Sequence, residues 1–232
     1  MKELPYKNGE IVQLLWTGGF DSTCLLILLL EQGVGVIPIY IQQNGVKVQA
    51  ELEVQRQIRE ALWTAFGKRV RETKILAWDQ APGTHYTEGQ PPKVSWQYPW
   101  LLACAPNILG MKDRTIELGV VAGDGQGAAN HIAEILAAYN GYLKALGFRS
   151  GIRAAFAEST KKQILDVVPE KYHRLLERTW TCERPVSGSG GLIVPCGGED
   201  CTLCKDRIVP AWGVKVDPHK ETELCEVQKH DG

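Results

Sequence analysis

Residues 14–26, LLWTGGFDSTCLL, place two adjacent glycines between two apolar runs. The run before the glycines, residues 10–16, has the composition of a buried parallel strand. The run after them predicts a helix that ends at Gly33 and whose start Asp21 or Ser22 could cap. A strand that turns into a helix over two glycines can present backbone N–H groups to an anion. The stretch therefore predicts an anion-binding turn.

Strand-like and helix-like segments alternate along the chain after this turn. Further strands are expected at 33–42, 73–79, 117–123 and 152–157. Helices are expected at 46–67, 100–114, 128–147 and 159–168. This alternation predicts a doubly wound α/β fold with a mostly parallel sheet, in which ligands bind at the carboxyl ends of the strands. The glycine turn lies at such an end.

The length and composition indicate one main domain with an appendage. The chain has 232 residues, of which 44% are hydrophobic, enough to bury a sizeable core. We expect an α/β domain over residues 1–170 with a Gly- and Pro-rich insertion at about 80–100. A small cysteine-containing subdomain is expected at 171–212, followed by a polar tail at 213–232.

The charge balance and the short apolar runs argue against two kinds of partner, nucleic acids and membranes. The chain has 26 Lys and Arg against 27 Asp and Glu, which argues against an extended nucleic-acid surface. No apolar run is long enough to span a bilayer, and the first ten residues do not resemble a signal peptide. We therefore expect a cytoplasmic protein that does not bind membranes.

Four of the seven cysteines gather in one Gly- and Ser-rich stretch: Cys182, Cys196, Cys201 and Cys204. Four thiolates in one loop region can close a tetrahedral zinc site, and a Cys-x-x-Cys pair is a common chelating element. An iron–sulfur cluster or a redox pair of the last two cysteines are the alternatives. Cys24 and Cys104 lie in apolar runs and are expected to be small core residues.

Two common phosphate loops do not match the glycine turn. The P-loop requires Gly-Lys followed by Ser or Thr, and residues 16–24 contain no lysine. The dinucleotide fingerprint requires three glycines at fixed offsets, and only Gly18 and Gly19 are present. Ser22 adds a hydroxyl, and Asp21 adds a carboxylate suited to Mg²⁺. These groups favour a cradle for pyrophosphate.

The turn TGGFDST resembles the S-G-G-x-D-S/T loop of the N-type ATP pyrophosphatases, with Thr17 where the family usually has serine. Combined with four C-terminal cysteines, it resembles the 7-cyano-7-deazaguanine synthase (QueC) family. The segments TWTCE, FAESTKKQIL and VVAGD are similar to further family segments. The resemblance implies an adenine nucleotide alpha-hydrolase-like fold, ATP with Mg²⁺, one zinc on the four cysteines, and a homodimer.

The resemblance also assigns roles to individual residues. It places the pyrophosphate of ATP against Thr17, Gly18, Gly19, Asp21, Ser22 and Thr23. Asp21 is expected to orient Mg²⁺, and Lys161 to stabilise charge on the phosphates. Gly123 is expected beside the nucleotide, and the strand end at Tyr40 is expected to supply backbone groups to adenine.

The implied reaction converts 7-carboxy-7-deazaguanine to a nitrile. The carboxylate attacks the α-phosphate of ATP, ammonia displaces AMP to give the amide, and a second adenylation permits elimination to 7-cyano-7-deazaguanine. The protein contributes positioning and electrostatic stabilisation of the departing pyrophosphate.

The sequence departs from the family where the substrate pocket is expected. Residues 45–51, GVKVQAE, have Lys47 in place of the family's arginine and Val48 in place of its histidine, and CAPNIL at 104–109 lacks another arginine. An alternative is a relative of the synthase that transfers the activated acid to an amine of a protein or another acceptor. In this the chain would resemble synthase relatives that occur beside bacterial defence genes. A tRNA thiolase and a non-enzymatic zinc-binding module are further alternatives.

Overall fold

The computed structural model describes residues 4–42, 46–77, 97–111, 114–121, 131–182, 185–187, 192–196 and 214–215. Its larger sheet has five strands: β1 (Ile11–Leu15), β2 (Gly35–Gln42), β3 (Lys74–Ala77), β4 (Ile116–Leu118) and β5 (Ile152–Ala154). The α-helices are α1 (Phe20–Glu31), α2 (Val46–Phe66), α3 (Gln97–Met111), α4 (Ile132–Ala145), α5 (Lys161–Leu165) and α6 (His173–Leu176). The 3-10 helices η1 (Gly67–Arg69) and η3 (Glu170–Tyr172) are also present.

The larger sheet has the strand order β3-β2-β1-β4-β5, and every pairing in it is parallel. Leu15 at the end of β1 pairs with Ile39 of β2 and with Leu118 of β4. The carboxyl ends of these three strands therefore meet at one edge. The chain runs from β1 toward β2 on one side and later returns to β4 on the other side. This arrangement confirms the predicted doubly wound α/β fold and puts its switch point between β1 and β4.

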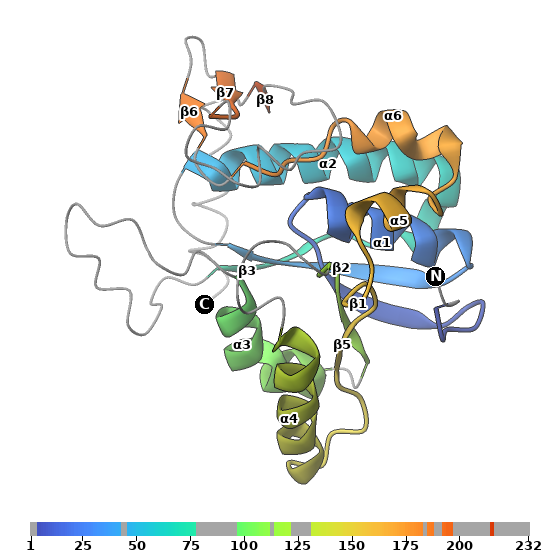
Figure 1. Cartoon of the computed structure of the whole chain (residues 1–232), viewed down its shortest axis with the longest axis vertical. Helices are drawn as coiled ribbons and strands as arrows, with labels where there is room; N and C mark the ends of the chain where they lie inside the picture. Colours follow the sequence, from blue (N-terminus) through green and yellow to red (C-terminus); the bar gives the residue numbers. More distant parts are fainter. Residues whose placement is uncertain are drawn as a thin grey trace, which may run out of the picture.

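The helices form a layer on each face of the sheet (Figure 1). Helices α1, α2, α5 and α6 cover one face, and α3 and α4 cover the other. Most of helix α1 is apolar on all sides, as expected for a helix that is enclosed by the sheet and by the neighbouring helices α5 and α6. Leu25, Leu26 and Ile27, which are successive residues and so point in different directions around it, are all fully buried. The opening of α1 is thereby held by packing on several sides.

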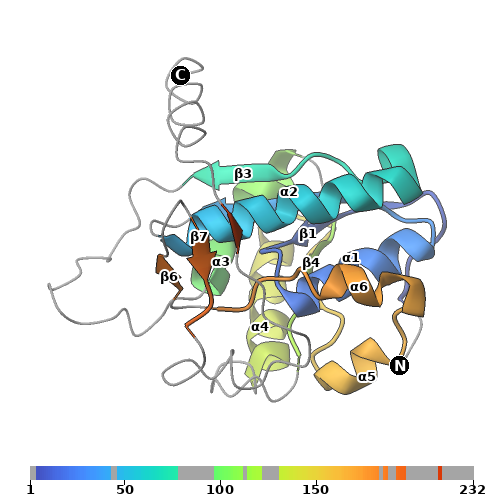
Figure 2. The ribbon, with the colours of Figure 1, turned by 90° about the horizontal axis from the view of Figure 1, so that it is seen from above.

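A second sheet of three short antiparallel strands lies near the C-terminal end of the described residues. Its strands are β6 (Val186–Ser187), β7 (Leu192–Val194) and β8 (Val214–Lys215). Figure 2 places this sheet beside the N-terminal end of α2, and β8 contacts that helix. The sequence did not predict these strands, since each has only two or three residues.

The expected side-chain cap of α1 is wrong. Phe20 is the first helical residue, so both Asp21 and Ser22 lie inside the first turn, and Gly19 takes the cap position without a side-chain hydrogen bond. The Ser22 hydroxyl instead donates to the carbonyl of Gly19 at 3.3 Å. The predicted end at Gly33 is confirmed, because this glycine has φ +85° directly after the helix.

Helix α5 shows the contrasting case of a complete side-chain cap. The Thr160 hydroxyl accepts from the backbone N–H of Gln163, whose side chain accepts from the backbone N–H of Thr160. The predicted helix at 159–168 is therefore present but shorter. Within the described residues, no helix is both long and apolar enough to cross a membrane.

The predicted strand 117–123 ends early because Gly119 leaves β4 to pack against the start of α1. A β-carbon at Gly119 would lie 2.5 Å from both the nitrogen and the α-carbon of Ser22. No side chain fits there without moving backbone. The close approach fixes α1 against the edge of the sheet.

Replacing Gly119 with alanine should destabilise the protein by about 1–3 kcal/mol, because the methyl group would overpack this contact. Gly141→Ala in α4 is the matched control, since a β-carbon there meets nothing within 4 Å. We expect it to stabilise by about 0.5–1 kcal/mol through helix propensity. Denaturant unfolding of both variants measures the difference, and equal stability of the two would contradict the account.

Candidate functional site

The loop Trp16–Gly19 leaves the end of β1 at the switch point of the sheet. The backbone N–H of Trp16 donates to the carbonyl of Ile39 at 2.9 Å, so the first loop residue is still held by β2. The chain then turns over Gly18 and Gly19 into α1. This is the edge at which ligands bind in doubly wound sheets.

Gly18 lets the loop lie directly against α2. Its φ of +76° is a conformation that other residues rarely adopt. A β-carbon there would lie 3.2 Å from Cγ of Gln55 and 3.3 Å from the carbonyl oxygen of Glu51. Both the backbone conformation and the contact with α2 therefore favour glycine.

Gly19 leaves the opening turn of α1 without a side-chain cap. The amide groups of a first helical turn have no acceptor within their own helix, and the helix dipole adds partial positive charge there. Helix α1 has 12 residues, which is long enough to develop this dipole. The site is therefore suited to an anionic ligand at the start of α1.

The hydroxyls of the loop make bonds within the loop itself. Thr17 Oγ1 accepts from the N–H of Gly19 at 3.2 Å. Thr23 is fully buried, and its Oγ1 accepts from the indole N–H of Trp16 at 3.0 Å. Together with the Ser22 bond to Gly19, these contacts fix the path of the chain between β1 and α1.

Asp21 lies in the first turn of α1 and is half-buried. Its carboxylate acts electrostatically on the thiol of Cys24, which lies three residues later on the helix. Burial raises the pKa of the Cys24 thiol, and the charge of Asp21 raises it further. Cys24 is thus a neutral core residue, as predicted, and Cys104 is also buried.

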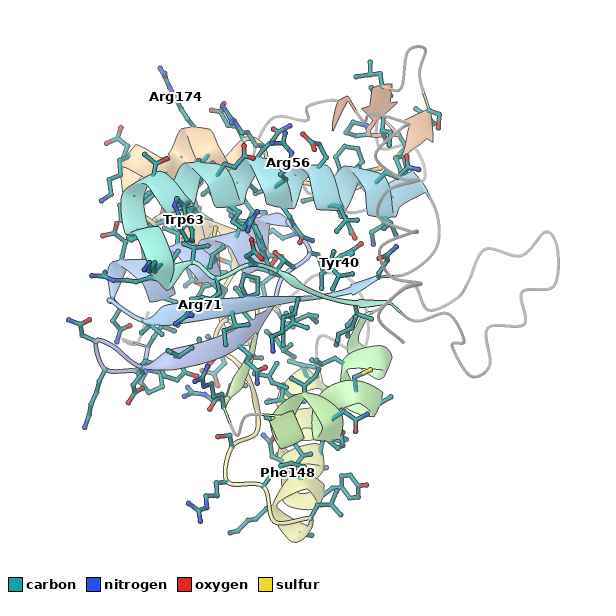
Figure 3. All side chains as sticks on the ribbon, turned by 180° about the vertical axis from the view of Figure 1, so that it is seen from behind. Tyr40, Arg56, Trp63, Arg71, Phe148 and Arg174 are labelled. Carbon is teal, nitrogen blue, oxygen red and sulfur yellow. The ribbon has the colours of Figure 1, made fainter. Side chains whose placement is uncertain are left out.

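Tyr40 points from β2 into the layer between the sheet and α2 (Figure 3). Its hydroxyl donates to Oε2 of Glu51 at 2.5 Å, and Nζ of Lys47 lies 3.3 Å from Oε1 of the same carboxylate. The Tyr40 side chain is fully buried, and that of Lys47 is 18% exposed. These groups link the first two turns of α2 to the end of β2.

The residues before the first predicted metal ligand cross the glycine loop. The backbone N–H of Trp180 donates to the carbonyl of Gly18 at 2.9 Å, and the Trp180 carbonyl lies 3.3 Å from where a β-carbon of Gly19 would be. The indole N–H of Trp180 donates to the carbonyl of Cys182 at 2.9 Å. One short segment therefore joins the candidate anion site to the cysteine region, a contact that sequence reasoning missed.

Cys182 and Cys196 are brought together. The N–H of Cys196 donates to Sγ of Cys182 at 3.3 Å, a contact that favours sulfur carrying negative charge. Cys201, Cys204 and Gly123 lie outside the described residues. In the part of the chain that the structure describes, no three His, Cys, Asp or Glu side chains form a candidate metal site. The zinc ligand set therefore stays a prediction.

Lys161 is the first residue of α5, which packs beside α1 on the same face of the sheet. The loop that precedes α5 begins at the carboxyl end of β5, the same edge as the glycine loop. Lys161 and the glycine loop therefore lie on the same face of the sheet, and the role of Lys161 at the phosphates stays a prediction.

No protein-family model matches the chain, and no curated protein sequence matches it. Among solved structures, it is similar to the U34-tRNA thiolase NcsA from Methanococcus maripaludis, determined with its 4Fe-4S cluster. The two share 15% sequence identity with a TM-score of 0.45, and the match covers 75% of this chain. It covers 58% of that protein, so the chain spans less than two thirds of its length.

Thr23→Val should destabilise the protein by about 1–3 kcal/mol, because the buried indole N–H of Trp16 would lose its acceptor. Thr64→Val is the control, since Thr64 is exposed on α2 and should change stability by less than about 0.5 kcal/mol. Urea unfolding followed by tryptophan fluorescence measures both. Unchanged stability of Thr23→Val would contradict the role given to Thr23.

Proposed function

We propose that the chain is an ATP pyrophosphatase that activates a carboxylate as its adenylate. The observation that carries the proposal is the Gly18–Gly19 turn at the switch point, which leads into an α1 that has no side-chain cap. Cleavage between the α and β phosphates releases pyrophosphate, whose negative charge the opening of α1 can stabilise.

In this proposal the loop residues divide into two groups. The backbone N–H groups of the first turn of α1 bind the phosphates, with the glycines allowing close approach. Thr17, Ser22 and Thr23 hold the loop in its binding conformation through the bonds described above. A loop fixed in advance binds its ligand without having to become ordered.

The residues at the loop fit Mg²⁺. Asp21 offers a carboxylate, and Thr17 and Ser22 offer hydroxyls, the oxygen donors that this ion prefers. Bound Mg²⁺ would neutralise charge on the β and γ phosphates. Lys161, from the same face of the sheet, is proposed to stabilise the charge that develops as pyrophosphate departs.

The proposed acid is 7-carboxy-7-deazaguanine, with ammonia as the acceptor and 7-cyano-7-deazaguanine as the product. The sequence resemblance of the loop and the cysteines supports this assignment. The carboxylate oxygen attacks the α-phosphorus and pyrophosphate leaves; ammonia then attacks the carbonyl carbon and AMP leaves with the bonding electrons. A second adenylation, on the amide oxygen, precedes loss of AMP to form the nitrile. Lys47 and Val48, which differ from the family, lie in the first turn of α2.

Zinc is proposed on Cys182, Cys196, Cys201 and Cys204. The contact between the first two supports it, since an N–H donated to sulfur stabilises a thiolate. Through Trp180, a metal there would fix the segment that crosses Gly18.

The reaction can be tested by incubating the protein with MgATP, 7-carboxy-7-deazaguanine and ammonia, and identifying the products by mass. AMP, pyrophosphate and the nitrile are expected. AMP with the acid attached to a supplied amine or protein would instead support transfer to another acceptor. Sulfur incorporation into tRNA would indicate a thiolase, and ATP left intact with every acid would favour a binding module.

Asp21→Asn and Lys161→Ala should each lower the rate of pyrophosphate release by at least about 100-fold, through loss of Mg²⁺ orientation and of charge stabilisation. The neighbouring exposed residues Asp166 and Lys162 provide matched controls as Asp166→Asn and Lys162→Ala, which should retain the rate. Pyrophosphate is measured by a coupled assay, with circular dichroism as a check of folding. Normal turnover by either site variant would refute its assignment.

Cys201→Ser should lower the zinc content of the purified protein, because three thiolates hold the ion more weakly than four. Cys104→Ser, in a buried position of α3, should keep its zinc. Elemental analysis measures both variants. Zinc that is unchanged in Cys201→Ser would contradict the proposed ligand set.

A further inference from the structure

The side chain of Gln55 lies in an uncommon environment. It is only 3% exposed, and among the described residues neither its amide oxygen nor its amide nitrogen has a hydrogen-bond partner. Buried amide groups are nearly always paired, because leaving one unpaired forfeits its hydrogen bonds to water. A buried amide that is unpaired in this way has a donor and an acceptor to offer a ligand.

Gln55 packs on the glycine loop. Its Cγ lies 3.2 Å from the position that a β-carbon of Gly18 would occupy, so its stem covers the residue at the centre of the turn. Its α2 neighbour Gln57 differs, since the amide of Gln57 donates to Oε1 of Glu53 at 2.8 Å. Of these two glutamines on α2, one has a hydrogen-bonded amide and the other an unpaired amide, and the unpaired amide belongs to the residue that packs on the glycine loop.

We propose that Gln55 binds the nucleotide, with its amide nitrogen donating a hydrogen bond to an oxygen of the pyrophosphate group. This inference rests on the proposed function and adds a binding residue from α2 to the groups of the β1–α1 loop. A neutral amide suits the position, because it can remain buried when no ligand is bound without the desolvation cost of a buried charge. A phosphate oxygen is a charged acceptor and strengthens the bond.

Gln55→Met tests the proposal, because it keeps an unbranched side chain of similar length and removes the amide. We expect the Kd for inorganic pyrophosphate to rise about 10-fold or more, as for loss of a hydrogen bond to a charged group. The melting temperature without ligand should not fall, since no internal hydrogen bond is lost. Gln57→Met, the matched control, should leave the Kd unchanged. Titration calorimetry and thermal unfolding supply the two readouts.

Gln55→Glu supplies a second test that does not depend on packing. It has the same shape, but an ionised carboxylate would repel pyrophosphate, whereas the protonated acid has a donor. At each pH the Kd of the variant is divided by that of the wild type. This ratio should be largest at high pH and should fall toward one as the pH is lowered. A merely structural role for Gln55 would not produce this dependence. If Gln55→Met does not fold, this ratio decides.

Three outcomes would overturn the inference. Unchanged pyrophosphate affinity in Gln55→Met, with the wild type binding normally, would leave the proposed function intact and remove Gln55 from it. Weakened binding of AMP with unchanged pyrophosphate affinity would place the amide at the α-phosphate instead. A wild type that binds neither pyrophosphate nor MgATP would overturn the proposed function and this inference together.

Discussion

At the start of α1 the backbone lies so close to three other segments that no side chain fits between them. The rest of the site depends on this close packing. Gly119 at the end of β4 lies against Ser22, and Gly18 lies against α2. Gly19 is close to the carbonyl of Trp180. Three segments that are distant in sequence therefore converge on one turn, and glycine permits each approach.

This convergence explains how an uncapped helix start is tolerated. The usual side-chain cap stabilises a helix by about 1 kcal/mol, and α1 lacks one. Burial on several sides offsets the missing cap, since most of α1 is enclosed by the sheet and by α5 and α6. The amides of the first turn are thereby left without a side-chain acceptor. In the proposed function, packing along the helix supplies stability and the opening turn binds the phosphates.

Trp180 connects the cysteine region to the glycine loop. Trp180 bonds to Gly18 through its backbone and to Cys182 through its indole. The same segment follows α6, which packs on α1, so the contact is supported from both sides.

The periodicity of the sequence predicted the five parallel strands, the helices between them and the glycine turn, because these are local patterns. Periodicity does not predict features that depend on contacts between segments distant in sequence. The sequence predicts Asp21 or Ser22 as the cap of α1, whereas the helix already begins at Phe20 and Gly19 takes the cap position. Nothing in the spacing of Trp180 or Gln55 indicates that either packs on the turn, since both lie far from it in sequence. The roles of Gly123, Cys201 and Cys204 stay predictions.

The central claim is that the turn at Gly18 and Gly19 binds the pyrophosphate part of ATP. A crystal structure with Mg²⁺ and an ATP analogue that carries a methylene bridge between the α and β phosphates tests it directly. The account predicts the β and γ phosphates against the backbone amides at the start of α1, with the adenosine beyond the carboxyl ends of the strands. Phosphates bound elsewhere, with this turn touching only solvent, would contradict it.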